Sequence, residues 1–183
     1  MAKTALLLID FQNDYFWGGK WQLVGTEAAA AQGAKLLAAF RDKGLPVVHV
    51  RHEFPTDDAP FFLPGSEGAQ IHSSVAPQAG EPVVLKQQIN SFRDTELKQL
   101  LDEQGIEHLV IVGAMSHMCI DAGARAAADF GYEVSVAHDA CATLDLSFDG
   151  KTVAAADVHH AYMSALSFGY GRVACTDELL ADL

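Results

Sequence analysis

Positively charged side chains are scarce in this sequence, and their scarcity excludes two classes of partner. Lysine and arginine together number 12, against 24 aspartates and glutamates, so the formal net charge is −12. No basic run is longer than two residues. Nucleic acids and anionic membrane surfaces are bound by clustered positive charge. We therefore expect no nucleic-acid partner and no membrane partner.

Long hydrophobic runs are also missing. Asp, Gly or His interrupts every apolar run, so no segment is long enough to span a bilayer. The first residues, "MAKTALLLIDFQND", hold one lysine and five apolar residues before Asp10. This run is too short for the apolar region of a signal peptide and is typical of a buried strand. The expected location is the cytoplasm.

Cysteines are few, and their spacing matches no known framework. The three are Cys119, Cys141 and Cys175, with no CxxC pair and no zinc-module spacing. A disulfide framework is therefore not expected, and each cysteine has to be judged by its neighbours. Cys141 and Cys175 lie beside turns and have no candidate base or helix start comparable to those near Cys119. We interpret both as structural.

Half of the 183 residues are hydrophobic, which suits one domain with one substantial core. Strand-like and helix-like segments alternate along residues 1–183, which is typical of an α/β domain with a parallel sheet covered on both faces. The expected strands are residues 4–9, 45–50, 81–86, 107–113, 132–140 and 171–176. The expected helices are residues 27–44, 94–105, 117–131 and 151–169, with a C-terminal helical turn. The irregular segment 51–80 is too long for a plain connection, and we interpret it as a loop covering the active site.

Three reactive side chains follow strands of the predicted sheet. Asp10 follows the first strand, Lys86 ends the third, and Cys119 comes after the fourth, at the start of a helix. In open parallel sheets, ligands bind beyond the carboxyl ends of the strands. A carboxylate, an ammonium and a thiol are therefore expected to meet in one crevice.

These three groups suit nucleophilic catalysis. If Ser116 caps the helix, Cys119 lies in its first turn, where the helix dipole and Lys86 would favour the thiolate. Asp10 would accept the thiol proton as a general base. Each residue also has a structural interpretation: a cysteine is often a small core residue, an aspartate a turn residue, and a strand-ending lysine a surface group. Spacing alone leaves both interpretations open.

The chain also resembles a known family, the isochorismatase-like cysteine hydrolases, over nearly its whole length. The resemblance lies in four stretches: "LLLIDFQNDYF" (6–16), "PGSEGAQIH" (64–72), "VVLKQQINSFRDTELKQLLDEQGI" (83–106) and "LVIVGAMSHMCIDAGARAAADFGYEVSVAHDA" (109–140). The resemblance implies a three-layer αβα sandwich whose six-stranded, mainly parallel sheet has the order 3-2-1-4-5-6. It also implies a homo-oligomer, either a dimer or a tetramer.

The resemblance assigns roles to the three strand-end residues. It makes Asp10 the base, Lys86 the orienting cation and Cys119 the nucleophile. It places a cis peptide between Ala114 and Met115, and an oxyanion hole at the backbone amides of Met115 and Cys119. It implies no cofactor. The family contains nicotinamidases and other small-amide hydrolases, and also isochorismate hydrolases that cleave a vinyl ether and in many cases lack the cysteine.

In one place the chain departs from the nicotinamidases. They bind a metal through an aspartate and histidines just after the second strand, where this chain has "HVRHEFPTDD". Because that ligand pattern is not reproduced, we expect no metal. His52, Asp57 and His72 are the residues that would form a metal site if one existed.

Aromatic side chains gather in the segments expected to form the pocket, and they favour a small planar or apolar substrate. The predicted substrate-binding residues are Gln12, Phe16, Phe61, Asn90, Phe92 and His117. Turn capping is the alternative for the two amides, and a solvent-facing position is the alternative for the histidine. The mid-helix pair His159-His160 is expected to face another helix or a subunit.

Our leading hypothesis is a metal-independent cysteine amidohydrolase. The alternatives are a vinyl-ether or ester hydrolase of the isochorismatase type, and a non-catalytic small-molecule binding protein on the same fold. A dinucleotide-binding domain is disfavoured, because Asp10-Phe11-Gln12-Asn13 stands after the first strand in place of GxGxxG.

Overall fold

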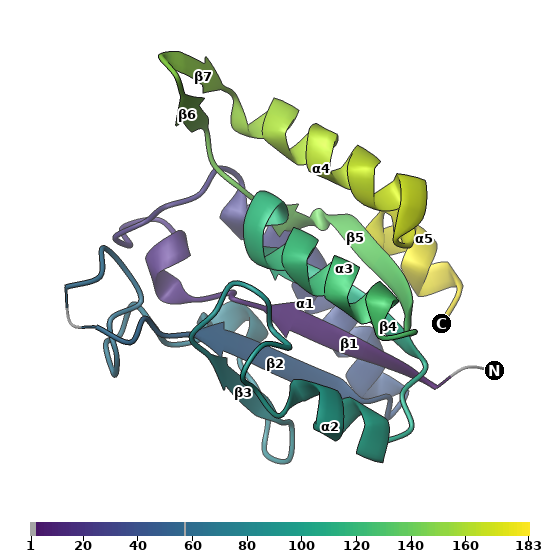
Figure 1. Cartoon of the computed structure of the whole chain (residues 1–183). Coiled ribbons are helices and arrows are strands. Elements are labelled where there is room, and N and C mark those ends of the chain that lie inside the picture. Colours follow the sequence, from purple (N-terminus) through teal and green to yellow (C-terminus); the bar gives the residue numbers. More distant parts are fainter. Residues whose placement is uncertain (1–2, 57) are drawn as a thin grey trace.

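The protein is built around one six-stranded parallel sheet (Figure 1). The computed structural model describes residues 3–56 and 58–183. The strand order β3-β2-β1-β4-β5-β8 confirms the predicted order, since β8 is the sixth strand that the sequence predicted. The strands of this sheet are β1 (Thr4–Ile9), β2 (Val47–His52), β3 (Val83–Lys86), β4 (His108–Ala114), β5 (Glu133–Ala142) and β8 (Arg172–Ala174).

Helices cover both faces of the sheet. In Figure 1, α3 (Asp121–Asp129) lies in front of the sheet and α1 (Thr26–Asp42) lies behind it. The apolar side chains of α2 (Leu97–Glu103), α3 and α4 (Ala155–Gly169) share one core cluster, and those of α1 and α5 (Thr176–Ala181) share the other. The predicted three-layer αβα sandwich is therefore confirmed. None of the helices in the described part of the chain has the length and apolar character needed to cross a bilayer.

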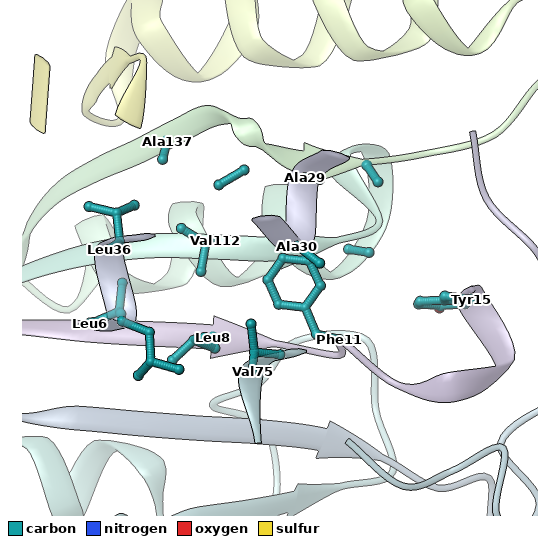
Figure 2. Packing of buried hydrophobic residues seen from close by; sticks show 14 of the residues in the cluster. Leu6, Leu8, Phe11, Tyr15, Ala29, Ala30, Leu36, Val75, Val112 and Ala137 are labelled. Atoms are coloured by element: carbon teal, nitrogen blue, oxygen red, sulfur yellow. The ribbon is translucent and has the colours of Figure 1, made fainter. Parts of the chain in front are cut away.

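Strand β1 shows how the sequence places one core on each face. Leu6 and Leu8 belong to the cluster on the α1 side, whereas Leu7 and Ile9 belong to the cluster on the α3 side. Successive side chains of a strand point to opposite faces, so a continuous apolar run can serve both cores. Figure 2 shows Leu6 and Leu8 among residues of the α1-side cluster. Each fully buried leucine contributes about 1.5–3 kcal/mol of transfer free energy.

The helix predicted over 151–169 starts four residues late, at Ala155. Residues Lys151–Val153 form β7 instead, paired antiparallel with β6 (Leu146–Phe148) in a hairpin that the sequence analysis missed. The turn residues Asp149 and Gly150 have φ of 49° and 72°, and such positive pairs suit two-residue hairpins. The Asp-Gly dipeptide was the signal for this hairpin.

Smaller corrections apply to other elements. The predicted second strand lies two residues later, over Val47–His52, so the covering loop begins at residue 53 and not at 51. The predicted helix over 117–131 is divided, with a π-helical turn over Ser116–Ile120 before α3.

Backbone hydrogen bonds tie the covering loop to the segment after β1. The amide of Asn13 donates to the Gln70 carbonyl at 3.0 Å, and the amide of Asp14 donates to the Gly68 carbonyl at 2.9 Å. The Asp14 carboxylate also accepts from the Phe62 amide at 2.7 Å. These bonds form a strap that holds residues 61–72 at the carboxyl end of β1.

Candidate active site

Asp10 lies where β1 ends and the chain turns. Its φ is 55°, a left-handed conformation that aspartate tolerates better than most residues. Its amide donates to the Val50 carbonyl of β2 at 2.9 Å, which fixes the turn against the neighbouring strand. The side chain is fully buried. The turn thus places a carboxylate inside the protein at the carboxyl edge of the sheet.

Lys86 is the last residue of β3, and its ammonium is the centre of the site. The side chain is fully buried. Its Nζ lies 2.8 Å from Asp10 Oδ2 and 3.3 Å from Cys119 Sγ. The Lys86 ammonium and the Asp10 carboxylate therefore form a buried ion pair. The structure therefore brings the three predicted strand-end residues together.

A distorted turn after β4 carries Cys119. Gly113 has φ of 132°, and a Cβ at this position would lie 1.9 Å from the Ile9 carbonyl oxygen of β1. The peptide between Ala114 and Met115 is cis, at the bond to which the resemblance pointed. A π-helical turn follows, in which the amides of Met118 and Ile120 both donate to the Met115 carbonyl.

The predicted helix cap at Ser116 is wrong. Met115 occupies the capping position, and the turn has no side-chain cap. The Ser116 hydroxyl instead donates to the Ala142 carbonyl at 3.3 Å and lies 2.8 Å from His159 Nδ1 of α4. Ser116 thus anchors the turn that carries Cys119 to β5 and α4.

The surroundings of Cys119 favour the neutral thiol over the expected thiolate. Cys119 is only 3% exposed, and burial, followed by the nearby Asp10 carboxylate, raises the pKa of its thiol to about 12. Lys86 lowers this pKa but does not outweigh those two effects. Burial lowers the pKa of Lys86, but the charges of Asp10 and Cys119 leave it raised overall. The resting site therefore holds a neutral thiol beside an ion pair.

His52 is a neighbour of this site that sequence reasoning did not assign to it. It is the last residue of β2, and its Nδ1 lies 3.2 Å from Lys86 Nζ. Because an ammonium has only donors, Nδ1 must accept this bond, so the imidazole is neutral. Burial, followed by the charge of Lys86, lowers the pKa of His52 to about 4. The available signal was its position just after the predicted second strand.

Tyr15 is a second such neighbour. It lies in the short 3-10 helix after β1 and is 2% exposed. Burial, followed by the nearby groups of Cys119 and Asp10, raises its pKa well above the ordinary value. Tyr15 therefore stays neutral and adds a phenol close to the charged groups.

The predicted aromatic residues lie in different surroundings. Phe16 stacks on His72 with ring centroids 3.7 Å apart, and both line a hollow of about 450 Å³ under the strap. Phe61 packs between Tyr15 and Trp21 inside the covering loop. Phe92 packs on Phe130 and Tyr132, in the core on the α3 side.

The predicted polar contacts have partners within the protein. Gln12 Nε2 donates to the carbonyls of His52 and Ala69 at 2.7 and 2.8 Å, and its Oε1 accepts from the His52 amide. Both of its donors are therefore used in bracing β2 and the covering loop. Asn90 Oδ1 accepts from the Phe92 amide, the turn-capping alternative. His117 Nδ1 lies 2.7 Å from Thr143 Oγ1, in the turn that carries Cys119.

Comparison with known proteins places the chain in a family. Residues 4–167 match the model of the Isochorismatase domain, which is most of the chain. The chain belongs to the isochorismatase family.

Relatives in this family match along nearly the full length. The isochorismatase family protein YddQ of Bacillus subtilis is 49% identical over 177 residues, covering 97% of this chain and 98% of its own. Maleamate amidohydrolase of Pseudomonas putida is 32% identical over 195 residues, covering 99% and 87%. A crystal structure assigned to the isochorismatase hydrolases, from Oleispira antarctica, is 73% identical with a TM-score of 0.96, covering 98% and 97%. The chain is thus a hydrolase of the isochorismatase family.

Two of the three metal-ligand candidates, His52 and His72, make other contacts. His52 faces Lys86, and His72 Nδ1 lies 2.8 Å from Ser74 Oγ while its ring stacks on Phe16. Asp57 lies outside the described residues. The described part of the chain contains no cluster of three His, Cys, Asp or Glu side chains with the spacing of a metal site.

Proposed function

We propose that this member of the isochorismatase family is an amidohydrolase that cleaves the C–N bond of a small amide through a Cys119 acyl-enzyme. The observation that carries the proposal is the position of Lys86 Nζ, 2.8 Å from the Asp10 carboxylate and 3.3 Å from the Cys119 sulfur, in a site closed to solvent. The three side chains supply a base, a cation and a nucleophile, so the reaction as proposed needs no metal.

The first step is proton transfer within this group. At rest the Cys119 thiol is neutral, so it needs a base before it can attack. The Asp10 carboxylate lies close enough to the thiol to raise its pKa, so it is the base nearest to the thiol proton. As Asp10 becomes neutral, the negative charge moves to sulfur, and Lys86 stays paired with it throughout. The cation therefore lowers the cost of forming the thiolate.

The thiolate then attacks the amide carbonyl and forms a tetrahedral oxyanion. We assign its stabilisation to the backbone amides of Met115 and Cys119, because both belong to the turn that carries the nucleophile. Collapse of this intermediate breaks the C–N bond, and protonated Asp10 gives its proton to the leaving nitrogen. Water, deprotonated by Asp10, hydrolyses the acyl-enzyme and releases a carboxylic acid and Cys119.

A second argument comes from the relatives. The Pseudomonas putida relative is named as an amidohydrolase of maleamate, an amide. We propose that the substrate is likewise a small amide, which must enter through movement of the strapped loop, because Asp10, Lys86 and Cys119 are all buried. His52, whose Nδ1 lies 3.2 Å from Lys86 Nζ, and Tyr15, whose pKa the nearby groups of Cys119 and Asp10 raise, are proposed as positioning residues.

The test is a screen for ammonia release over small amides and ureas, with maleamate included. The Cys119→Ala variant should lose at least about 10⁴-fold in kcat on any active compound, because the nucleophile is removed. The matched control is Cys175→Ala, which removes the cysteine at the start of α5 and should keep most of the rate. A Cys119→Ala variant that kept its rate would remove the nucleophile from the mechanism, and a screen without any ammonia release would count against amide hydrolysis.

A further inference from the structure

One face of helix α4 contacts the π-helical turn that carries Cys119. His159 Nδ1 lies 2.8 Å from Ser116 Oγ, and the ring of Tyr162 stands edge-on to the ring of His117, with centroids 6.0 Å apart. Residues three positions apart on a helix are neighbours on one side of it. Two successive residues of the turn are therefore held by the same side of α4.

The same two residues of the turn are also held by the end of β5. The Ser116 hydroxyl donates to the Ala142 carbonyl at 3.3 Å, and His117 Nδ1 lies 2.7 Å from Thr143 Oγ1. Ala142 is the last residue of β5 and pairs with Ala114, the last residue of β4. The turn thus lies between α4 and the sheet, and the single hydroxyl of Ser116 contacts both.

The one proton of the Ser116 hydroxyl decides the direction of these contacts. Ser116 uses this proton to donate to the Ala142 carbonyl, so towards His159 it can only accept. His159 Nδ1 must therefore carry a hydrogen and donate it to Ser116 Oγ. Burial, followed by the nearby imidazoles of His138 and His160, lowers the pKa of His159, so at pH 7 its ring is neutral and Nδ1 holds the only ring proton. The result is one chain of hydrogen bonds, from α4 through the turn to β5.

The neighbouring histidine has different contacts. His160 is exposed, and its Nδ1 lies 2.7 Å from the Ala156 carbonyl of its own helix. His159 is half-buried and reaches out of α4 to the turn. The mid-helix pair therefore contains one imidazole that bonds within α4 and one that connects α4 to the turn.

We propose that His159 is a positioning residue, which donates to Ser116 and so holds the π-helical turn with the Cys119 thiol in place for attack. The sulfur lies 3.3 Å from Lys86 Nζ, and Ser116 precedes it in the same turn. A misplacement of about 1 Å can cost about 10²-fold in rate, so an anchor this close to the nucleophile affects catalysis. For its effect on the rate the inference rests on the proposed function, whereas the place of the thiol itself can be tested without a substrate.

The first test compares variants of His159 in the full chain. His159→Phe keeps a planar ring but removes the donor, and it should lower kcat about 10- to 100-fold on an amide found by the ammonia screen, with KM changed less than about twofold. His159→Asn places an amide N–H near the position of Nδ1, so it should keep at least about a third of the wild-type kcat. His160→Phe is the matched control, because the neighbouring imidazole bonds to its own helix, and it should keep the wild-type kcat.

The second test is alkylation of Cys119 by iodoacetamide at pH 8, which needs no substrate. Without the bond to α4 the turn should open more often, so His159→Phe should be labelled about two- to tenfold faster than the wild type, the effect of one lost hydrogen bond. Ser116→Ala should be labelled at least as fast, and the double variant no faster than Ser116→Ala, because the bond is already lost there. His159→Asn and His160→Phe should match the wild type.

Three outcomes would overturn the proposal: an unchanged labelling rate in His159→Phe, an unchanged kcat of this variant on an active amide, and an Asn variant that behaves like the Phe variant. A proton found on Nε2 of His159 and not on Nδ1, by NMR of the histidine nitrogens, would also contradict it. If no amide releases ammonia but labelling changes as expected, the proposed function fails while His159 still positions the thiol. Circular dichroism checks folding, and Ser116→Ala repeats both tests if His159→Phe does not fold.

Discussion

Replacing Asp10 by Asn should change the reactivity of Cys119 in two opposite directions. In the proposed mechanism Asp10 is the general base, so its loss should lower amide hydrolysis by about 10²–10⁴-fold. The same carboxylate raises the pKa of the thiol. Its removal leaves the buried Lys86 ammonium without its counter-charge, and the Cys119 thiolate is the nearest group that can replace it. The variant should therefore be a poorer catalyst with a more acidic thiol.

The magnitude follows from the position of the thiol. Its pKa is raised from 9.0 to about 12, first by burial and then by Asp10. Three pKa units correspond to about 4 kcal/mol, and to a thiolate fraction about 10³-fold smaller than that of an ordinary cysteine below pH 9. Asn keeps the burial but removes the charge, so the pKa should fall by at least about one unit, which makes labelling at least about tenfold faster.

The assay is alkylation by iodoacetamide at pH 8, followed by mass spectrometry of the cysteine peptides. In the wild type, the half-buried Cys175 should be labelled well before Cys119. In Asp10→Asn the Cys119 peptide should be alkylated faster than in the wild type, whereas the rate for the Cys141 peptide should not change. Asp121→Asn is the matched control, because it removes a carboxylate two residues from Cys119 that pairs with Arg125 instead.

Two results would refute this reasoning. If wild-type Cys119 is alkylated faster than Cys175 below pH 8, the resting thiol is not neutral. If Asp10→Asn is folded by circular dichroism but labels Cys119 no faster, Asp10 does not hold the thiol in its protonated form.

Two further predictions concern stability. The pKa of His52 is lowered from the ordinary 6.5 to about 4, because the folded protein favours the neutral imidazole. Its contribution to the free energy of unfolding is therefore fully present above pH 6.5, and about 3 kcal/mol is lost as the pH falls to 4. Urea unfolding at pH 7 and pH 4.5 should show a smaller loss for His52→Gln than for the wild type, and equal losses would contradict the assignment. Gly113→Ala should cost at least about 3 kcal/mol, because its Cβ would overlap the Ile9 carbonyl oxygen, whereas Gly131→Ala, with open space around it, should cost about 1 kcal/mol in the same assay.

The sequence predicted the sheet because apolar runs such as Leu6–Ile9 report burial directly. It also predicted that Asp10, Lys86 and Cys119 lie close together, because the carboxyl ends of parallel strands share one edge of the sheet. It could not predict the protonation of Cys119, because that depends on how completely the folded chain excludes water. Position in sequence suggested a cap at Ser116 and a substrate contact at Gln12, but tertiary partners redirected both side chains.

The sequence analysis missed the β6–β7 hairpin for a different reason. The residues Asp149-Gly150 between Phe148 and Lys151 are a strong local turn signal, but the helical pattern of the following segment was extended over it. The error was one of boundary, and it hid the strand that carries Phe148, a large hydrophobic side chain that is 87% exposed.

The strap between the segment after β1 and the covering loop separates two tasks within one small domain. Its bonds run largely from backbone to backbone, as between Asn13 and Gln70 and between Asp14 and Gly68. Exposed side chains of this segment, such as Glu67 and Gln70, are therefore free to change without loosening the attachment, whereas Phe62 and Ala69 are buried. Because the strap holds the loop mainly through backbone bonds, the loop can be replaced by the corresponding segment of a relative. Grafting this segment from a relative should change which molecules are accepted while leaving the bond-breaking apparatus intact.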